Sequence, residues 1–157
     1  MNTKELFAAL RTAFSSEYAF LIKTQDAHWN VQGEEFYQDH LLFERIYTEV
    51  GEAIDPLAEN LRKTQCFVPS GLAKMSDLSI LEDWPADDLT CDDYYRGLLR
   101  DSDAMADLFA AAFDLAEQYH EHGLSNFMAD RQDQHRKHSW MLRASLVKSD
   151  TTNQGVA

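Results

Sequence analysis

Residues 26–62, DAHWNVQGEEFYQDHLLFERIYTEVGEAIDPLAENLR, hold the pattern on which a prediction of fold and chemistry can be built. Five side chains in this segment are of the kinds that bind hard or borderline metal ions. They are His28, His40, Glu44, Asp55 and Glu59. His40 and Glu44 are four residues apart, as are Asp55 and Glu59, so the members of each pair share one face of a helix. The segment therefore predicts a helix that carries two pairs of metal-binding side chains.

The separation of the two pairs decides how they can be used. His40 and Asp55 are fifteen residues apart, which returns them to about the same side of a helix but places them roughly 22 Å apart along its axis. One helix cannot bring both pairs to one ion. Two copies that run antiparallel across a two-fold axis can, because His40 and Glu44 of one copy then face Asp55 and Glu59 of the other.

The length and composition predict one soluble domain. The chain has 157 residues, of which 45% are hydrophobic and 26% charged, with only 6 Gly and 3 Pro. These values are typical of a globular protein built from long helices. The net charge of −13 argues against a surface for nucleic acid or anionic membranes. Cys66 and Cys91 form no CxxC motif, and we see neither a signal peptide nor a membrane-spanning run, so we expect a cytoplasmic protein.

Four long helices are predicted by apolar residues that recur at intervals of three and four. Their expected bounds are residues 3–31, 35–63, 90–123 and 125–148. Thr3 is a candidate N-cap for the first helix, and Thr90 with Asp93 forms a candidate capping box for the third. The second helix contains Gly51 and Pro56, so two shorter helices that meet near Pro56 are the alternative.

The connection between the second and third helices, residues 64–89, is long and contains a short predicted helix at residues 76–83, with Ser76 as its N-cap. Such a connection suits two parallel neighbours better than a tight antiparallel turn. The fold class we expect is therefore all-α, a ferritin-like four-helix bundle with a short extra helix between helices 2 and 3. We expect residues 1–148 to form this domain and residues 149–157 to be a polar, disordered tail.

Each candidate ligand also has an ordinary structural interpretation. His28 could be a polar residue at a helix end, beside a core tryptophan, and Glu44 could pair with Arg45 or Lys63 on a surface. Asp55 and Glu59 could lie on a solvated helix face. The five residues fall within 32 positions at helical spacing, which favours a shared site for iron, manganese or zinc at a subunit interface.

The motifs resemble a known family. HWNVQG at residues 28–33, the D-x-x-x-E of residues 55–59, and HSWMLRA at residues 138–144 are similar to the Dps mini-ferritins, the DNA-binding proteins from starved cells. The similarity extends over nearly the whole chain. It implies a four-helix bundle with a short helix in the long connection, and assembly into a hollow dodecamer.

The resemblance also implies a chemistry. Ferroxidase centres of this family lie at two-fold interfaces, where His28, His40 and Glu44 of one subunit would face Asp55 and Glu59 of another. Glu44 stands where the family more often has Asp. The implied reaction is oxidation of Fe(II), with hydrogen peroxide preferred over dioxygen, followed by storage of the ferric mineral and protection against oxidative stress. Zinc or manganese could occupy the same site.

Two departures from the family bear on DNA binding and on the entry of iron. Members that bind DNA directly carry a tail rich in Lys and Arg, whereas here the N-terminus offers only Lys4 and no basic residue follows Lys148. We therefore expect no direct DNA binding. In the family, the turn between the third and fourth long helices usually lines an acidic iron-entry pore. In this chain His122 and Asn126 stand in that turn where acids are common.

Further roles are expected at three acids and one tryptophan. The remaining candidates for the pore are Glu117, Glu121 and Asp130. Trp29, next to a ligand, could take up stray oxidising equivalents, although packing at the dimer interface is the interpretation we favour.

The sequence leaves two other functions open. A full-size ferritin or another di-iron bundle needs two Glu-x-x-His motifs, and this chain has one, at Glu117 and His120. A non-enzymatic shell or nucleoid-associated DNA-protection protein of the same fold is the alternative from a different class. The complete ligand set argues against a purely structural shell, and the lack of a basic tail argues against DNA compaction.

Overall fold

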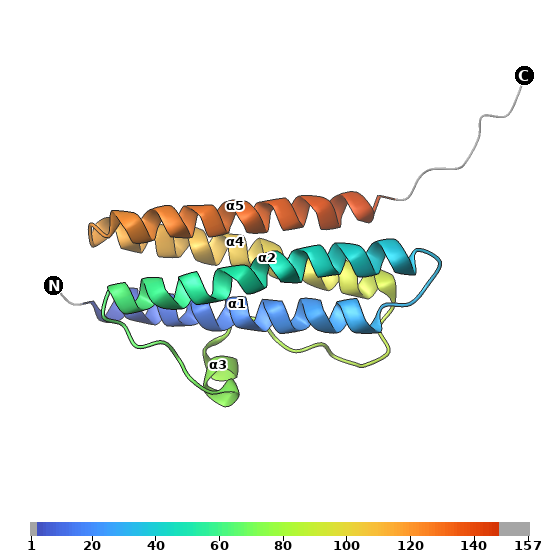
Figure 1. Ribbon diagram of the computed structural model, residues 1–157, viewed down its shortest axis with the longest axis horizontal. Helices are drawn as coiled ribbons and strands as arrows, with labels where there is room; N and C mark the ends of the chain where they lie inside the picture. Colours follow the sequence, from blue (N-terminus) through green and yellow to red (C-terminus); the bar gives the residue numbers. More distant parts are fainter. Residues whose placement is uncertain (1–2, 148–157) are drawn as a thin grey trace, which may run out of the picture.

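A computed structural model describes residues 3–147 of the chain. These residues form five helices and no strand, namely α1 (Lys4–Asn30), α2 (Phe36–Lys63), α3 (Leu72–Leu78), α4 (Cys91–Gln118) and α5 (His122–Ser145). The long helices α1, α2, α4 and α5 form a bundle, and α3 lies outside it against α1 (Figure 1). The predicted all-α bundle with an extra helix is confirmed. The predicted tail at residues 149–157 lies outside the described residues.

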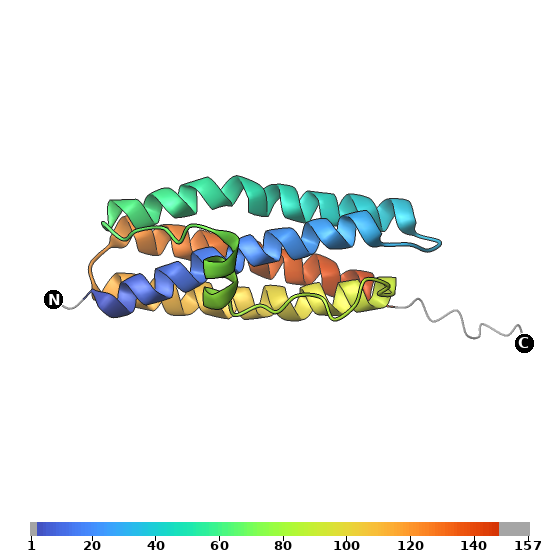
Figure 2. The same cartoon turned by 90° about the horizontal axis from the view of Figure 1, so that it is seen from below.

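The long connection gives the bundle its topology. It leaves the end of α2, carries α3, and then runs along the bundle to the start of α4, so α2 and α4 point in the same direction (Figures 1 and 2). This is the single-crossover arrangement expected for a ferritin-like bundle. Within the described residues, no helix is both long enough and apolar enough to cross a membrane.

Helix α2 is continuous through Pro56, so the alternative of two shorter helices is wrong. Its buried apolar residues lie on one stripe that continues on both sides of the proline. They are Phe43, Ile46, Val50, Ala53, Leu57 and Leu61. Burial of such a stripe against the bundle outweighs the loss of one backbone hydrogen bond. The two pairs of candidate ligands are therefore held on one rigid element of 28 residues.

The short helix lies earlier in the chain than predicted. It begins directly after Gly71, whose φ of +92° is one that glycine adopts readily, and ends at Leu78, so Ser76 lies in its last turn and is not its N-cap. No helix continues after Leu78, and Ser79 has an extended backbone instead. Ser16 on α1 explains this, because its hydroxyl accepts a hydrogen bond of 3.0 Å from the backbone N–H of Ile80.

The corner between α4 and α5 also differs from the prediction. The capping box at Thr90 and Asp93 is confirmed, but α4 ends at Gln118, and α5 already begins at His122. His120 has a φ of +59°, and the N–H of Glu121 donates to the carbonyl of Ala116 at 2.9 Å. This is a Schellman-type end with histidine in the position that glycine usually takes.

The end of α2 has the same kind of cap. Gln65 has a φ of +69° there, and the N–H of Cys66 donates to the carbonyl of Leu61 at 3.1 Å. Gln65, which carries a side chain, thus takes the left-handed position that usually belongs to glycine.

Trp84 fastens the crossover to the bundle. Its indole N–H donates to the carbonyl of Lys23 at 3.1 Å, and the Lys23 ammonium lies 4.5 Å from the centre of the ring. The same ammonium pairs with Asp101 at 2.5 Å. A cation held between a buried carboxylate and an aromatic face is favourable because both partners are shielded from water. The six-membered ring of the indole lies close to α4, in the space that a side chain at Gly97 would fill.

We expect Gly97→Ala to release this contact. A Cβ atom at Gly97 would lie 2.3 Å from Cζ3 of Trp84, so the ring must move, and the free energy of unfolding should fall by roughly 1–3 kcal/mol. Denaturant titration at matched protein concentration measures the change. Gly51→Ala is the control, since its Cβ would meet Leu21 only at 3.7 Å, and it should be neutral or stabilising by up to about 1 kcal/mol. Equal losses in both variants would contradict the role given to Trp84.

Candidate metal centre

His28 and His40 come together where α1 ends and α2 begins. Val31 and Gly33 lie in the short turn between these helices, and Gly33 adopts a φ of +138°, which favours glycine. Two imidazoles from the helices that flank this turn stack with their ring centres 3.6 Å apart and an angle of 18° between their planes. His28 is buried, so the pair forms the inner wall of the candidate centre.

The two histidines fix each other's orientation. Nδ1 of His28 donates to the carbonyl of His40, and Nδ1 of His40 donates to the carbonyl of His28, both at 2.8 Å. Because each Nδ1 carries its proton for this bond, each Nε2 keeps a lone pair for a metal ion. The sequence could not show this reciprocal bonding, which ties each ring to the backbone of the other helix.

Glu44 completes a group of three ligands. One ligand atom each from His28, His40 and Glu44 lies within 4.8 Å of the others, which is close enough to hold one ion. Among the residues that the structure describes, this is the one group of three or more His, Cys, Asp or Glu side chains with that spacing. Two imidazoles and one carboxylate suit iron, manganese or zinc and leave coordination positions open.

Asp55 and Glu59 do not join this group within one chain. They lie in the second half of α2, where both are exposed. Three of the five predicted ligands are thus brought together, and two are kept apart by the length of the helix. The predicted use of Asp55 and Glu59 by a second subunit stays a prediction. Trp29, beside His28, is 65% exposed in the single chain.

A buried contact next to His40 was missed in the sequence. Asp39 is buried, and its two carboxylate oxygens accept hydrogen bonds from the Tyr95 hydroxyl at 2.7 Å and from the Cys91 thiol at 3.0 Å. Burial and the neighbouring Asp39 raise the pKa of Cys91 to about 12, so the thiol stays protonated and donates. These contacts join the first turn of α2 to the first turn of α4 and so hold the helix end that carries His40.

The three candidate pore acids lie near the α4–α5 corner. Glu117 accepts hydrogen bonds from the Ser125 hydroxyl and from His122, at 3.2 Å in the second case. The Ser125 bond and then the His122 bond lower the pKa of Glu117. Glu121 precedes α5, and Asp130 is exposed on it. Whether these acids line a pore stays a prediction.

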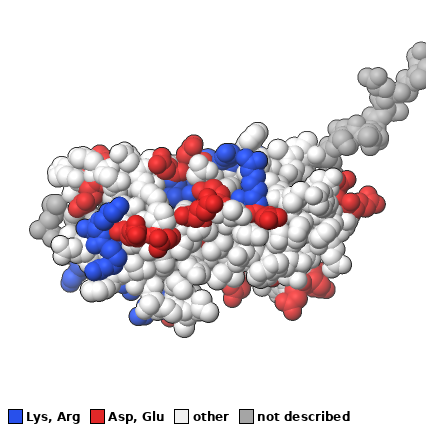
Figure 3. Space-filling view, in the orientation of Figure 1, with Lys and Arg blue, Asp and Glu red and all other residues white. Residues whose placement is uncertain are grey.

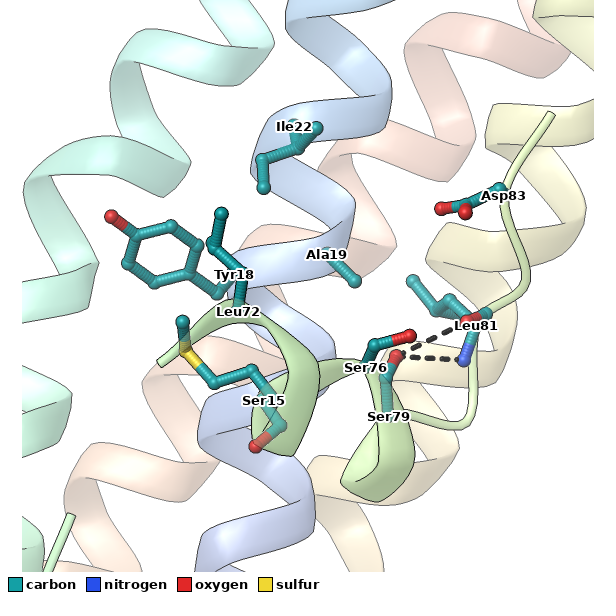
Figure 4. A pocket seen from close by; sticks show the side chains of 10 residues that line it. Ser15, Tyr18, Ala19, Ile22, Leu72, Ser76, Ser79, Leu81 and Asp83 are labelled. Atoms are coloured by element: carbon teal, nitrogen blue, oxygen red, sulfur yellow. Dashed lines mark hydrogen bonds between the residues drawn. The ribbon is translucent and has the colours of Figure 1, made fainter. Parts of the chain in front are cut away.

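A pocket of about 230 Å³ lies elsewhere, between α1 and the crossover (Figure 4). Tyr18 and Ile22 of α1 and Leu72 of α3 supply apolar walls, and three serine hydroxyls and the Asp83 carboxylate supply polar groups. No imidazole lines this pocket, so its chemistry differs from that of the metal centre.

Comparison with known proteins gives the class that this fold and centre define. The ferritin-like domain family matches residues 7–151. The structure of Dps from Thermosynechococcus elongatus has a TM-score of 0.90 at 20% identity, with 94% of each chain covered. Dps from Vibrio cholerae, described as a member of a broad superfamily of ferritin-like diiron-carboxylate proteins, has a TM-score of 0.86 at 26% identity, with 92% of this chain and 91% of that chain covered.

A curated relative points the same way. The DNA protection during starvation protein of Listeria monocytogenes is 24% identical over 150 residues, which is 95% of this chain and 94% of the relative. The chain belongs to the ferritin-like proteins, and within them to the Dps family. This family is associated in general with iron storage and the protection of DNA.

We expect Tyr95→Phe to weaken the α2–α4 contact beside the centre. The change leaves one oxygen of the buried Asp39 without its hydrogen bond, and the free energy of unfolding should fall by about 1.5–3 kcal/mol. Chemical denaturation checks the value. Tyr18→Phe removes the hydroxyl of a half-buried tyrosine on the wall of a pocket between α1 and α3 and should change the stability by less than about 0.5 kcal/mol. If the two variants unfold alike, the Asp39 contact does not hold the helix end.

Proposed function

We propose that this protein stores iron by oxidising Fe(II) at centres shared between two subunits. The observation that carries the proposal is the half-site of His28, His40 and Glu44, which is preformed in one chain but offers only one carboxylate. The partner subunit's Asp55 and the partner subunit's Glu59 would supply the missing charge, because an antiparallel pairing of α2 brings the far end of one helix to the near end of the other.

The donor set suits both oxidation states of the substrate. The two Nε2 atoms are borderline ligands that accept Fe(II), and the carboxylates of Glu44 and the partner's Asp55 favour the harder Fe(III) product. Hydrogen peroxide takes up two electrons, so two Fe(II) ions and two protons convert one peroxide to two waters. We propose peroxide as the preferred oxidant over dioxygen.

The surface around the half-site supports a second subunit there. Large apolar side chains close to His28 and His40 in sequence are exposed in the single chain, and water contact of such a group is unfavourable. They are Trp29, Phe36, Tyr37 and Leu41. We propose that the two-fold partner covers them, and that such dimers assemble into a cytoplasmic shell of twelve subunits that holds the ferric mineral.

The half-site can be tested by mixing two inactive variants. Alone, His28→Ala loses an imidazole from every centre, and Asp55→Ala loses the partner's carboxylate, so each should oxidise Fe(II) with peroxide at least tenfold more slowly than wild type. In co-expressed mixed dimers one of the two centres regains all ligands, and random pairing should restore about a quarter of the wild-type rate. Absorbance of the ferric product measures the rate.

The control for mixing uses two variants of the same half-site. His28→Ala mixed with His40→Ala cannot rebuild a complete centre, because both lost ligands lie in one half, so no activity should return. Recovery in this mixture, or none in the first, would show that the five residues are not divided between two chains as proposed.

We also propose that any protection of DNA comes from removal of iron and peroxide and not from direct contact. On the face drawn in Figure 3, Lys and Arg side chains lie beside Asp and Glu side chains and form no continuous basic surface. The net charge of −13 per chain opposes the phosphate backbone.

The expected result of a gel shift at low salt is therefore no discrete retarded band for duplex DNA without added divalent metal. A band that appears under these conditions and weakens with added salt would contradict this proposal and would favour the nucleoid-associated alternative. A basic DNA-binding protein loaded on the same gel confirms that the conditions permit binding.

A further inference from the structure

An apolar stripe runs along the outer side of α1 toward the candidate metal centre. Tyr18, Ile22 and Trp29 follow one another at intervals of four and seven residues, so their side chains leave the helix within about 40° of one another. Tyr18 is half-buried, Ile22 is 45% exposed and Trp29 is 65% exposed. A continuous row of large apolar side chains on a surface is typical of a face that another molecule covers.

The same stripe forms one wall of the pocket between α1 and α3. Tyr18 and Ile22 line this space of about 230 Å³ together with Leu72 and Met75 of α3 (Figure 4). Leu72 is 69% exposed, and Ile80, which follows α3 in the chain, is 47% exposed. The apolar surface of the stripe therefore continues across the pocket onto α3 and the crossover.

The spacing of the candidate ligands on α2 determines where a two-fold axis would pass. In the proposed pairing, His40 lies opposite the partner's Glu59, and Glu44 lies opposite the partner's Asp55. The midpoint along α2 is the same for both pairs and falls just before Val50. In an antiparallel pair of identical helices, the axis crosses each helix at the midpoint of the residues that face each other. The axis of the proposed dimer therefore crosses α2 at the level of Val50.

Contacts between α1 and α2 transfer this level to Ile22. A Cβ atom at Gly51 would lie 3.7 Å from Cδ1 of Leu21, so Leu21 of α1 lies beside the residue that follows Val50. The two helices run antiparallel (Figure 1), so the level of Val50 on α1 is about one residue after Leu21. Leu21 is half-buried, whereas Ile22 is exposed. Ile22 is therefore the exposed residue of α1 that lies nearest to the axis.

We propose that the two-fold axis of the dimer passes beside Ile22, and that the partner's Ile22 closes the pocket between α1 and α3. This inference rests on the proposed sharing of the metal centre between two subunits. A residue beside a two-fold axis meets its own copy, so each Ile22 packs against the other and against the walls that Tyr18 and Leu72 supply. Helix α3 carries no candidate ligand, but it becomes part of the interface that completes the centre.

Cysteine cross-linking of the full-length protein tests the position of the axis. Ile22→Cys places two thiols close together across the axis, so a short bis-maleimide should link most chains into covalent dimers. Ala8→Cys is the matched control, because Ala8 is exposed on α1 within about 40° of the same side. Its two copies would be roughly 40 Å apart, so no link should form. Wild-type protein, which contains Cys66 and Cys91, gives the background.

A second pair of variants tests the role of α3. Leu72→Glu changes a side chain that is 69% exposed in the single chain, so the subunit should fold, but a charge then lies at the pocket that the partner closes. The Kd of the dimer should rise at least about tenfold, and sedimentation velocity should detect monomers. Phe67→Glu replaces another apolar side chain of the same connection, which is 73% exposed and does not line the pocket, and it should not produce monomers.

The outcomes separate this inference from the proposed function. A wild-type protein that sediments as a monomer would contradict the shared centre and the position of the axis together. If the wild type forms dimers or larger particles, but Ile22→Cys is not cross-linked or Leu72→Glu keeps the wild-type mass, the position given to the axis is wrong and the shared centre is unaffected. The pocket would then be open to a small apolar molecule.

Discussion

The balance of charge around Arg131 is the constraint on which the bundle depends. Its guanidinium joins α5 to Glu17 on α1 and to Glu49 on α2, so three of the four long helices share one buried cation. Removal of one partner from a buried ion pair commonly costs about 3–5 kcal/mol, because the remaining charge has no water around it. Apolar packing gives these helices their attraction, but it is not directional. The charges fix which faces of the three helices meet.

That fixed arrangement positions the candidate metal centre at one end of the bundle. Once α1 and α2 are aligned, the turn through Gly33 brings His28 and His40 into stacking contact, and their reciprocal hydrogen bonds direct both Nε2 atoms away from the backbone. Asp39 holds the same end of α2 against α4. These contacts hold the candidate ligands in place without a metal ion, so binding of an ion there would cost little conformational entropy.

The sequence contained enough information for the fold and for the group of three candidate ligands, His28, His40 and Glu44. Helical spacing places His40 and Glu44 on one face, and the rise per residue separates them from Asp55, so both conclusions follow from local geometry. The end of α3 was predicted wrongly because it depends on a distant contact, the bond between Ser16 and Ile80, which are 64 residues apart. The start of α5 was predicted wrongly because His120 takes the left-handed position that usually belongs to glycine.

The ion pairs of Arg131 with Glu17 and Glu49 illustrate the same limit. Glu17, Arg131 and His138 each lie within an apolar helical stripe, which is an observable signal that a polar residue will be buried. The pattern does not name the partner, however, because Glu17 and His135 are 118 residues apart in the chain. Periodicity gives the face of a helix that is buried, and only the packed bundle shows which faces meet.

The two ends of the bundle differ in backbone strain. Gln65 and His120, which hold left-handed conformations at the ends of α2 and α4, both lie at the end of the molecule opposite the α1–α2 turn (Figure 1). A side chain in that conformation costs on the order of 1 kcal/mol relative to glycine. Local unfolding should therefore begin at the strained end, and amide hydrogen exchange should be faster there than beside the histidines. The bundle should therefore open first at the end opposite His28 and His40, close to the half of α2 that carries Asp55 and Glu59.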